Sequence, residues 1–323
     1  VCMLGWDTFV DDWISALPQD VQVEKVVSEK ADTLIRAIRR HDIIWIEWGH
    51  EVAIWLTNEA KDQLKGKRVI LRVHSYEVLN MLADRIDFRV VDDLVFVAPH
   101  ICNILLERKP EVKKQVKRIH IIANGVDLGK LSLSGKVPGY RVAFLGELNF
   151  KKDPMVFMHA FHALKEVDKR FELHIAGNIP EMRYKYAVEN FIRNNRLDAH
   201  VFHYGHVSEV SDWLADKDYI LCSSLMEGHP IGLLEAMAVG LRPLIYRYPG
   251  AEVFYPPEFM WKNMSDLKAL VKNSVERRCV RGFVKDNYSI ERQAESIRRM
   301  LNGEIMAFQH YSTGISKIRR GCQ

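Results

Sequence analysis

Short apolar segments alternate with amphipathic segments over the first 130 residues. The apolar segments are rich in branched and aromatic residues, as buried strands of parallel sheets are. They predict strands at 1–5, 42–48, 67–74, 94–98 and 118–123. The segments between them repeat apolar residues at helical spacing and predict helices at 7–17, 29–41, 51–64 and 98–109. Strands that alternate with helices in this way indicate a parallel sheet with helices on both faces.

Residues 127–140 are rich in Gly, Ser and Pro and are expected to form an interdomain linker. The alternation then restarts, which predicts a second doubly wound sheet. Its strands are expected at 141–146, 171–177, 200–205, 218–224 and 242–246, and its helices at 154–167, 183–195, 210–215 and 233–239. A turn at Asp286–Tyr288 and a final helix at 289–301 complete the pattern. We therefore expect an α/β protein with domains at 1–130 and 138–285, and a segment 286–323 whose helix returns to the first domain before a basic tail.

The length of 323 residues favours two domains, and 48% hydrophobic with 27% charged residues is typical of a globular enzyme. No apolar run is long enough to span a membrane, and the first residues lack the layout of a signal peptide. The five cysteines are scattered without metal-ligand spacing, so we expect reduced thiols and a cytoplasmic location.

The net charge of +4 is too small to indicate nucleic-acid binding. Basic residues gather in 108–118 and after residue 276. Solvated helix faces are the favoured interpretation of both runs. The alternative is weak peripheral contact with anionic lipid at the inner face of a membrane.

The common nucleotide-binding fingerprints are absent. The sequence contains no Gly-x-Gly, and the segment from Gly129 to Lys136 has the wrong spacing for a P-loop, with Val137 where Ser or Thr would hold magnesium. The sequence Asp216-Lys217-Asp218 is similar to a metal-binding Asp-x-Asp, but its position at a helix end favours surface charge. We expect no metal site and no cofactor.

Two glutamates, Glu227 and Glu235, are separated by seven residues around a loop that contains Pro230 and Gly232. An apolar helix follows and ends at Gly240. The free N–H groups and partial positive charge of a helix start suit phosphate oxygens. Carboxylates beside a diphosphate are useful if they accept hydrogen bonds from flanking hydroxyls. From the two acids alone, an equal alternative is that Glu235 stabilises the helix start and Glu227 is an ordinary loop residue.

With its surroundings, this stretch resembles a known family. The pattern S-x-x-E-G-x-P-x4-E-A-M-A-x-G-x-x-P at 224–243 is similar to the E-x7-E signature of retaining GT-B glycosyltransferases, specifically family 4, also called the group 1 family. Other segments follow in the family's order: IIANGVD at 121–127, FLGELNFKKDP at 144–154, LHIAG at 173–177, YGHV at 204–207 and DNYSIERQAESI at 286–297. The first domain agrees mainly through RVHSYE at 72–77.

The resemblance implies a fold of two Rossmann-like domains facing a central cleft, and a role for each matching residue. Glu235 would hold the ribose, Glu227 would contact the transferred sugar, and Lys152 would neutralise the diphosphate. His74 would touch the donor sugar, and the loop at Gly5 would approach the phosphates or the acceptor. The remaining donor contacts would come from the amides of His229, Ile231, Gly232 and Leu233, from the phosphate loop at Gly146, and, around the base, from Tyr204, Gly205, His206 and Val207.

The implied reaction is transfer of a sugar, with retention and without a metal, from a nucleoside-diphosphate sugar to a sugar or lipid-linked acceptor in polysaccharide, glycolipid or other glycoconjugate synthesis. Two departures from the family pattern matter: Glu147 stands where the family usually has Arg, and Pro230 where it often has Gly. Lys151 is one candidate for the missing cation. The rival interpretations are a nucleotide-sugar epimerase and a non-catalytic nucleotide-sugar-binding subunit.

The segment WIEWGHE at 45–51 ends a strand of the first domain. Through Glu47, Trp48 or His50 it could line an acceptor cleft. Buried aromatic packing beside a capped helix start is the favoured interpretation.

Overall fold

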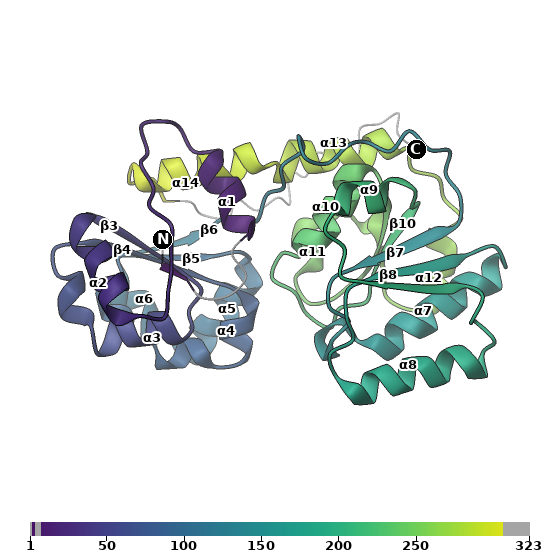
Figure 1. Ribbon diagram of the computed structural model, residues 1–323, viewed down its shortest axis with the longest axis horizontal. Helices are drawn as coiled ribbons and strands as arrows, with labels where there is room; N and C mark the ends of the chain where they lie inside the picture. The colour runs from purple at the N-terminus through teal and green to yellow at the C-terminus, as the bar shows by residue number, and fades with distance from the viewer. Residues whose placement is uncertain (1, 4–7, 306–323) are drawn as a thin grey trace. The chain divides into compact units, whose positions relative to one another are not determined.

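The computed structural model describes residues 2–3 and 8–305. Their contacts divide the chain into two compact units (Figure 1). Of the described residues, the first unit contains those up to Gly125 and those from Ile290 to Ile305, and the second contains Val126–Ser289. Gly5, which the sequence placed in a phosphate or acceptor loop, lies outside the described residues.

In the first unit the described residues form a six-stranded parallel sheet in the order β2-β1-β3-β4-β5-β6. Its strands are β1 (Cys2–Met3), β2 (Val26–Val27), β3 (Ile43–Glu47), β4 (Arg68–Val73), β5 (Asp93–Phe96) and β6 (Arg118–Ile121). Its helices are α1 (Thr8–Ser15), α2 (Ala31–Arg40), α3 (Glu51–Asn58), α4 (Ser75–Leu79), α5 (Pro99–Arg108), α6 (Val112–Gln115) and α14 (Ile290–Leu301), with 3-10 helices at Lys61–Leu64, Leu82–Arg85 and Phe88–Val90. Trp45, Ile70 and Val95 point from three neighbouring strands to the face covered by α1 and α14. The remaining helices lie on the other face (Figure 1).

In the second unit the described residues form a parallel sheet in the order β12-β11-β10-β7-β8-β9. Its strands are β7 (Arg141–Leu145), β8 (Glu172–Ala176), β9 (Val201–Gly205), β10 (Tyr219–Cys222), β11 (Arg242–Tyr246) and β12 (Met260–Trp261). Its helices are α7 (Pro154–Val167), α8 (Met182–Asn194), α9 (Val210–Ala215), α10 (Ile231–Val239), α11 (Ala251–Phe254), α12 (Met264–Leu270) and α13 (Arg277–Tyr288), with 3-10 helices at Phe150–Lys152 and Pro257–Phe259. Phe144, Phe157 and Phe161 belong to the core on the α7 face of this sheet.

A buried aspartate lies at the amino edge of the first sheet and accepts several hydrogen bonds there. The Asp93 carboxylate, at the start of β5, accepts hydrogen bonds from Arg68 (2.7 Å), Arg118 (2.6 Å) and His120 (2.8 Å). Arg68 also donates to the carbonyl oxygens of Met300 (2.8 Å) and Leu301 (2.5 Å), at the end of α14. A cation at a helix C-terminus is favourable because the last carbonyls carry partial negative charge. This cluster therefore fastens the returning helix to the sheet.

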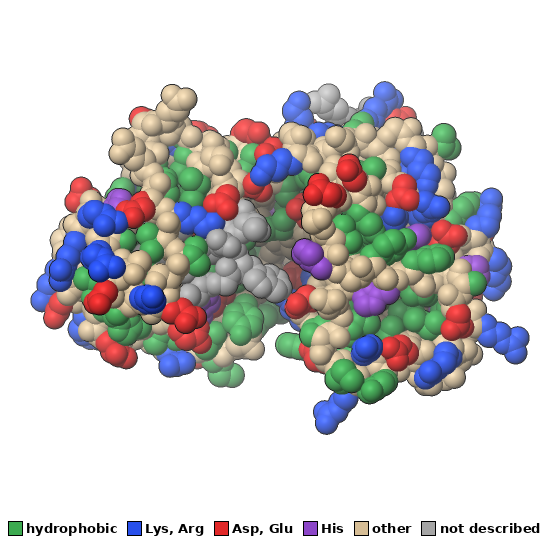
Figure 2. Space-filling model, viewed as in Figure 1, with side chains coloured by type: hydrophobic (Ala, Val, Ile, Leu, Met, Phe, Trp, Pro, Cys, Tyr) green, Lys and Arg blue, Asp and Glu red, His purple; other side chains and the backbone are tan. Residues whose placement is uncertain are grey.

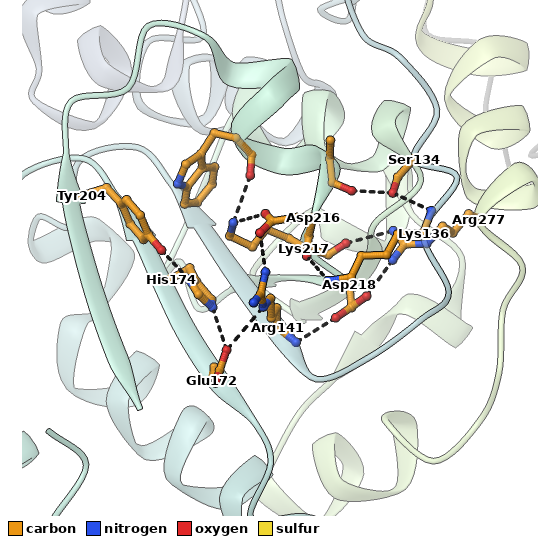
Figure 3. A network of polar contacts seen from close by, with 12 residues as sticks. Ser134, Lys136, Arg141, Glu172, His174, Tyr204, Asp216, Lys217, Asp218 and Arg277 are labelled. Atoms are coloured by element: carbon orange, nitrogen blue, oxygen red, sulfur yellow. Dashed lines mark hydrogen bonds and ion pairs between the residues drawn. The ribbon is translucent and has the colours of Figure 1, made fainter. Parts of the chain in front are cut away.

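A second buried aspartate closes the amino edge of the other sheet (Figure 3). Asp218 accepts hydrogen bonds from the Arg141 amide (2.9 Å) and from the Arg277 guanidinium (2.7 Å). The triplet 216–218 is therefore not surface charge, as the sequence suggested, because Lys217 and Asp218 are buried and Asp216 is half-buried. Its role in the described structure is to join α13 to the start of β7 and β10.

The segment expected to be a linker, 128–140, is fastened to the second unit. Ser134 donates to the Ala215 carbonyl (2.5 Å), and Lys136 donates to the Asp216 carbonyl (2.8 Å; Figure 3). Arg281 of α13 donates to the carbonyl oxygens of Leu128 (2.9 Å) and Leu131 (2.5 Å). The chain therefore passes between the units before this segment, at Gly125–Val126, and passes back at Ser289–Ile290.

The structure corrects three local expectations. There is no turn at 286–288, because α13 continues through Tyr288 and ends at Ser289. The helix expected at 51–64 ends at Asn58 and is followed by a separate 3-10 turn. Cys102 and Cys222 are free and buried, but Cys279 takes part in a disulfide, which its sequence spacing did not indicate.

Among the described residues, no helix has the length and apolar content needed to cross a bilayer. The basic run at 108–118 is largely engaged in ion pairs: Arg108 with Asp84, Lys117 with Asp92, and Arg118 with Asp93. On the face drawn in Figure 2, basic and acidic side chains are mixed over each unit. This mixture agrees with the solvated surface expected from the sequence.

We predict that Asp93→Ala lowers the free energy of unfolding by about 3 kcal/mol, because it leaves the half-buried guanidinium groups of Arg68 and Arg118 and the buried ring of His120 without this acceptor. Burial alone would raise the pKa of Asp93, but hydrogen bonds from His120, Arg118 and Arg68 outweigh it and hold the pKa well below its usual range. Stability from a carboxyl with a lowered pKa is present above its unfolded pKa of about 3.9 and is lost as the pH falls below it. Urea unfolding at a series of acidic pH values should show the difference between wild type and variant shrinking. A constant difference would contradict this assignment.

Candidate functional site

The strand order of the second unit reverses between β7 and β10. From β7 the chain continues outward through β8 and β9, then returns to β10 on the other side of β7. The loops after β7 and β10 therefore leave the sheet side by side at its carboxyl edge. Ligands of open parallel sheets bind at such a point, because the two loops diverge and leave a crevice.

Lys152 and Glu227 meet at this point. Lys152 lies in the loop after β7 and Glu227 in the loop after β10. Their side chains form an ion pair in which Glu227 is buried and Lys152 is half-buried. Ser224 also donates to Glu227 (3.0 Å). Ser223 donates to the Lys152 carbonyl (2.6 Å), and the Leu225 amide donates to that of Lys151 (2.8 Å). The two loops are thus bonded together through both backbone and side chains.

Both members of the Lys152–Glu227 pair are charged. Burial raises the pKa of the Glu227 carboxyl, but the positive charges of Lys152 and Lys151 and the hydrogen bonds it accepts outweigh this, and the net pKa is lowered. Burial lowers the pKa of the Lys152 ammonium, but its interactions with Glu227 raise the net pKa. A cation held by one carboxylate can exchange part of that interaction for a phosphate oxygen.

Helix α10 begins beside this pair. Pro230 precedes its first residue, Ile231, and Gly240 ends it with a φ of 93°. The start of α10 packs closely on β7, since a Cβ on Gly232 would lie 3.1 Å from the Leu145 carbonyl oxygen. The first N–H groups of a helix lack intrahelical acceptors. The amides of Ile231, Gly232 and Leu233 are therefore placed at the same edge as Lys152, and half-buried Glu235 follows one turn later.

The His229 side chain is turned into the protein. Its ring stacks on Phe254 with centroids 4.4 Å apart and contacts Tyr288 (4.6 Å) and Tyr255 (6.2 Å). Only 4% of the residue is exposed. A role for His229 in binding is thus confined to its backbone, which is the role that the resemblance implied.

Three glycines line the carboxyl edge next to this pair, at the ends of β7, β8 and β9. Gly146, Gly177 and Gly205 have φ values of 128°, 130° and 68°, a region in which side chains are strained. The Gly177 amide donates to the Gly205 carbonyl (2.6 Å), and a Cβ on Gly177 would lie 1.9 Å from the Gly146 carbonyl oxygen. The sequence singled out Gly146 and Gly205 but missed Gly177. Its position at the end of an apolar strand, in LHIAG, was the available signal.

The expected base-binding segment follows β9, the edge strand of the sheet. Tyr204 is 46% exposed, and its hydroxyl lies 2.9 Å from His174 Nδ1 (Figure 3). His206 is exposed and Val207 is half-buried. The ring of Tyr204 already contacts the rings of His174 and Trp213, and contact with a base stays a prediction.

Glu147 directly follows Gly146 and is half-buried. The structure places a second cation elsewhere in the same loop, because the charge of Lys151 contributes to lowering the pKa of Glu227. A role for Lys151 as the second cation stays a prediction.

In the first unit, His74 lies in a buried polar cluster at the carboxyl edge of β3 and β4. His74 Nε2 is 2.7 Å from Glu47 Oε1, and Arg72 donates to the same oxygen (3.3 Å). The ring of Trp48 stacks on His74 with centroids 4.1 Å apart. Glu47 is 1% exposed, as expected for buried packing of the segment 45–51. Trp48 and His50 are half-buried, however, and the expected cap is wrong, because the His50 side chain makes no capping hydrogen bond at the start of α3.

Within residues 2–3 and 8–305, no group of three or more His, Cys, Asp or Glu side chains could hold a metal ion. Of the sequence-predicted residues of the second unit, those on the loops after β7 and β10 and on α10 come together around Lys152 and Glu227. Those of the 204–207 segment lie at the same edge of the sheet, two strands away.

Residues 135–259 match the family model described as glycosyl transferases group 1. The chain is also similar to solved structures. Sucrose-phosphate synthase (tll1590) from Thermosynechococcus elongatus shares 15% identity, covering 88% of this chain and 81% of that one, with a TM-score of 0.65. Anabaena HepE (Alr3699) in complex with UDP shares 12% identity over 84% and 82%, with a TM-score of 0.68. A glycosyltransferase from Rickettsia africae shares 14% identity over 94% and 90%, with a TM-score of 0.63. No curated protein sequence matches this one.

These comparisons, with the two parallel sheets, define the class: the chain has the GT-B fold of glycosyltransferases. The predicted resemblance to the group 1 glycosyltransferases is confirmed, and the matching segment contains the Lys152–Glu227 pair and α10.

We predict that Lys152→Met lowers the free energy of unfolding by about 3–5 kcal/mol, because Glu227 stays buried without its cation. Adding Glu227→Met should recover much of that loss. The pKa of Glu227 is lowered, so its contribution to the free energy of unfolding is lost as the pH falls below about 4.3. The pKa of Lys152 is raised, so its contribution is lost as the pH rises above about 10.4.

Denaturant unfolding of the single and double variants measures this coupling. Lys65→Met, which removes an exposed ion pair with Asp62, is the matched control and should leave the unfolding midpoint unchanged. Equal effects of Lys152→Met and Lys65→Met would contradict the assignment.

Proposed function

We propose that this protein transfers a sugar from a nucleoside-diphosphate sugar to an acceptor, with retention of the anomeric configuration. The observation that carries the proposal is the ion pair between half-buried Lys152 and buried Glu227 beside the start of α10, at the point where the strand order reverses. This arrangement puts a cation, helix amides and a carboxylate at one place. A diphosphate flanked by two sugars needs those three kinds of group.

The diphosphate would accept hydrogen bonds from the amides of Ile231, Gly232 and Leu233, where the partial positive charge of the helix start favours an anion. Gly146 has no side chain and a Cβ there would meet open space, so the phosphates can approach its backbone closely. Lys152 would neutralise the charge that develops on the leaving diphosphate as the glycosidic bond breaks. Such stabilisation is usually the largest contribution to catalysis.

The carboxylates would hold hydroxyls on either side of the diphosphate, Glu227 those of the transferred sugar and Glu235 those of the ribose. In the proposed reaction the acceptor hydroxyl attacks the anomeric carbon from the leaving-group face. The bond between this carbon and the diphosphate oxygen breaks, and the diphosphate takes the acceptor proton. Lys152 and the helix start take the place of a metal ion in this scheme.

The base would rest on the segment Tyr204–Val207. HepE and the pneumococcal O-GlcNAc transferase GtfA were both solved with UDP, so UDP-sugars are the first donors to test.

In the first unit, His74 would contact the transferred sugar, and the loop at Gly5 would approach the phosphates or the acceptor. We propose a sugar or lipid-linked acceptor and a cytoplasmic role in polysaccharide or glycoconjugate synthesis, with weak membrane contact in the lipid-linked case.

Glu147 favours a second candidate, a nucleotide-sugar-binding subunit without activity of its own, because it replaces a cation with an anion beside the diphosphate. Hydrolysis of the donor by the purified protein discriminates between the two candidates. Transfer predicts slow release of nucleoside diphosphate from the donor, while the binding subunit predicts none. An epimerase would convert the donor in the absence of any acceptor.

We predict that Glu235→Ala and Lys152→Ala each reduce transfer by at least about a hundredfold, the scale of losing one electrostatic contact to the transition state. Asp198→Ala, an exposed acid between α8 and β9 at the opposite edge of the sheet, is the control and should keep full activity. Circular dichroism checks that each variant is folded. Near-normal turnover of both site variants would overturn the proposed function.

We also predict that, among UDP-, GDP-, ADP- and dTDP-sugars, donors with one base only raise the melting temperature. A ligand that binds the folded protein stabilises it in proportion to the logarithm of its concentration over Kd, so a thermal-shift series identifies the base that binds. Transfer with that donor should persist in EDTA. A strict magnesium requirement would contradict the metal-independent scheme, and the absence of any shift would count against donor binding.

A further inference from the structure

The contacts of Glu47 identify which nitrogen of the His74 ring carries a proton. Its Oε1 lies 2.7 Å from His74 Nε2 and 3.3 Å from Arg72, and its Oε2 accepts from the indole of Trp45 (2.8 Å). Burial raises the pKa of Glu47, but the charge of Arg72 and the hydrogen bonds from His74 and Trp45 outweigh it, and the net pKa is lowered. Glu47 is therefore a carboxylate, and a carboxylate only accepts hydrogen bonds.

The proton shared with Glu47 must accordingly lie on Nε2 of His74. In a neutral imidazole the other nitrogen, Nδ1, is then an acceptor. The ring is also held in place. Trp48 stacks on the ring, and Phe9 contacts it edge-on with centroids 5.9 Å apart. The backbone N–H of His74 donates to Glu77 (3.2 Å).

The cluster is fixed through several strands. Arg72, on β4, donates to Asn124 (2.6 Å), which follows β6. Glu77 also accepts from the Gly49 amide (2.6 Å), so it ties the loop after β3 to that after β4. Glu47, Arg72 and Glu77 are all fully or almost fully buried. The groups that face His74 are thus Glu47 on β3, Glu77 on α4 and the rings of Phe9 and Trp48, with Arg72 balancing the charge of Glu47.

The first unit contains a comparable cluster at the opposite edge of its sheet. The buried carboxylate of Asp93 is likewise joined to a histidine, His120, here with two arginines in place of one, but it lies at the amino edge of the sheet. Open parallel sheets bind ligands at the carboxyl edge, where Glu47 and His74 lie. The two clusters have similar chemistry and opposite placement, which makes one a control for the other.

We propose that Glu47 is a positioning residue that keeps His74 as the Nε2–H tautomer, so that Nδ1 is the ring nitrogen that accepts a hydrogen bond from a hydroxyl of a bound ligand. The identity of that ligand rests on the proposed function, whereas the tautomer does not. The contribution of Glu47 to transfer is orientation: without it the imidazole samples both tautomers and other ring positions. Misplacement of a contact group by about 1 Å can cost a hundredfold in rate.

The test is ¹H–¹⁵N NMR of the histidine rings at mildly alkaline pH, with the His74 signals assigned by their loss in His74→Gln. Wild type should show a protonated Nε2 and an unprotonated Nδ1. Glu47→Gln keeps an acceptor oxygen and should retain this tautomer. The double variant Glu47→Leu/Arg72→Met removes the acceptor together with the cation that would otherwise be left buried, and it should show a mixture.

Kinetics on the same proteins give the second readout. The double variant should lower kcat about tenfold to a hundredfold with a smaller change in the donor KM, and Glu47→Gln should lie between it and wild type. Asp93→Asn is the matched control, expected to lower the melting temperature and to change neither the His74 signals nor kcat.

Protonated Nδ1 in wild type, or an unchanged tautomer and kcat in the double variant, would overturn the role of Glu47. An absence of transfer by wild type with every donor would instead reject the proposed function, and the NMR result would still decide the tautomer.

Discussion

The return of the chain from β9 to β10, beside β7, is the constraint on which the candidate donor site depends. It brings together two loops that are far apart in sequence, and it places the first turn of α10 against the end of β7. Parallel pairing then directs every strand end of the second unit to the same edge. The Lys152–Glu227 pair is a consequence of this geometry, because neither loop could supply both charges by itself.

The two edges of each sheet have different chemistry. At the amino edges, Asp93 and Asp218 are satisfied by arginines that also join the sheet to α14 and α13. At the carboxyl edge of the second sheet, glycines with positive φ and the start of α10 leave backbone groups accessible. The buried acids at the two carboxyl edges include Glu47, Glu77 and Glu227. Stability and ligand binding are thus assigned to opposite ends of the same strands.

Much of this architecture follows from the sequence pattern. Apolar runs predicted the longer strands, and the residues around Glu227 and Glu235 indicated both the helix start and the glycosyltransferase resemblance. The two-residue strands β2 and β12 are too short to leave a periodic signal. Helix α13 contains Gly282 and many polar residues, and it forms because Val280, Phe283 and Val284 are buried on one side. The contact between Glu47 and His74 joins residues on different strands, so no local pattern indicates it.

The central claim is that a nucleoside diphosphate binds at the start of α10, beside Lys152. The most direct measurement is a ¹H–¹⁵N amide spectrum of the protein titrated with the nucleoside diphosphate of the preferred donor. The account predicts that the amides of Ile231, Gly232 and Leu233 shift together with that of Gly146, and with one common Kd. Shifts confined to the amino edge of the sheet, or unchanged amides at 231–233 while the ligand binds, would contradict it.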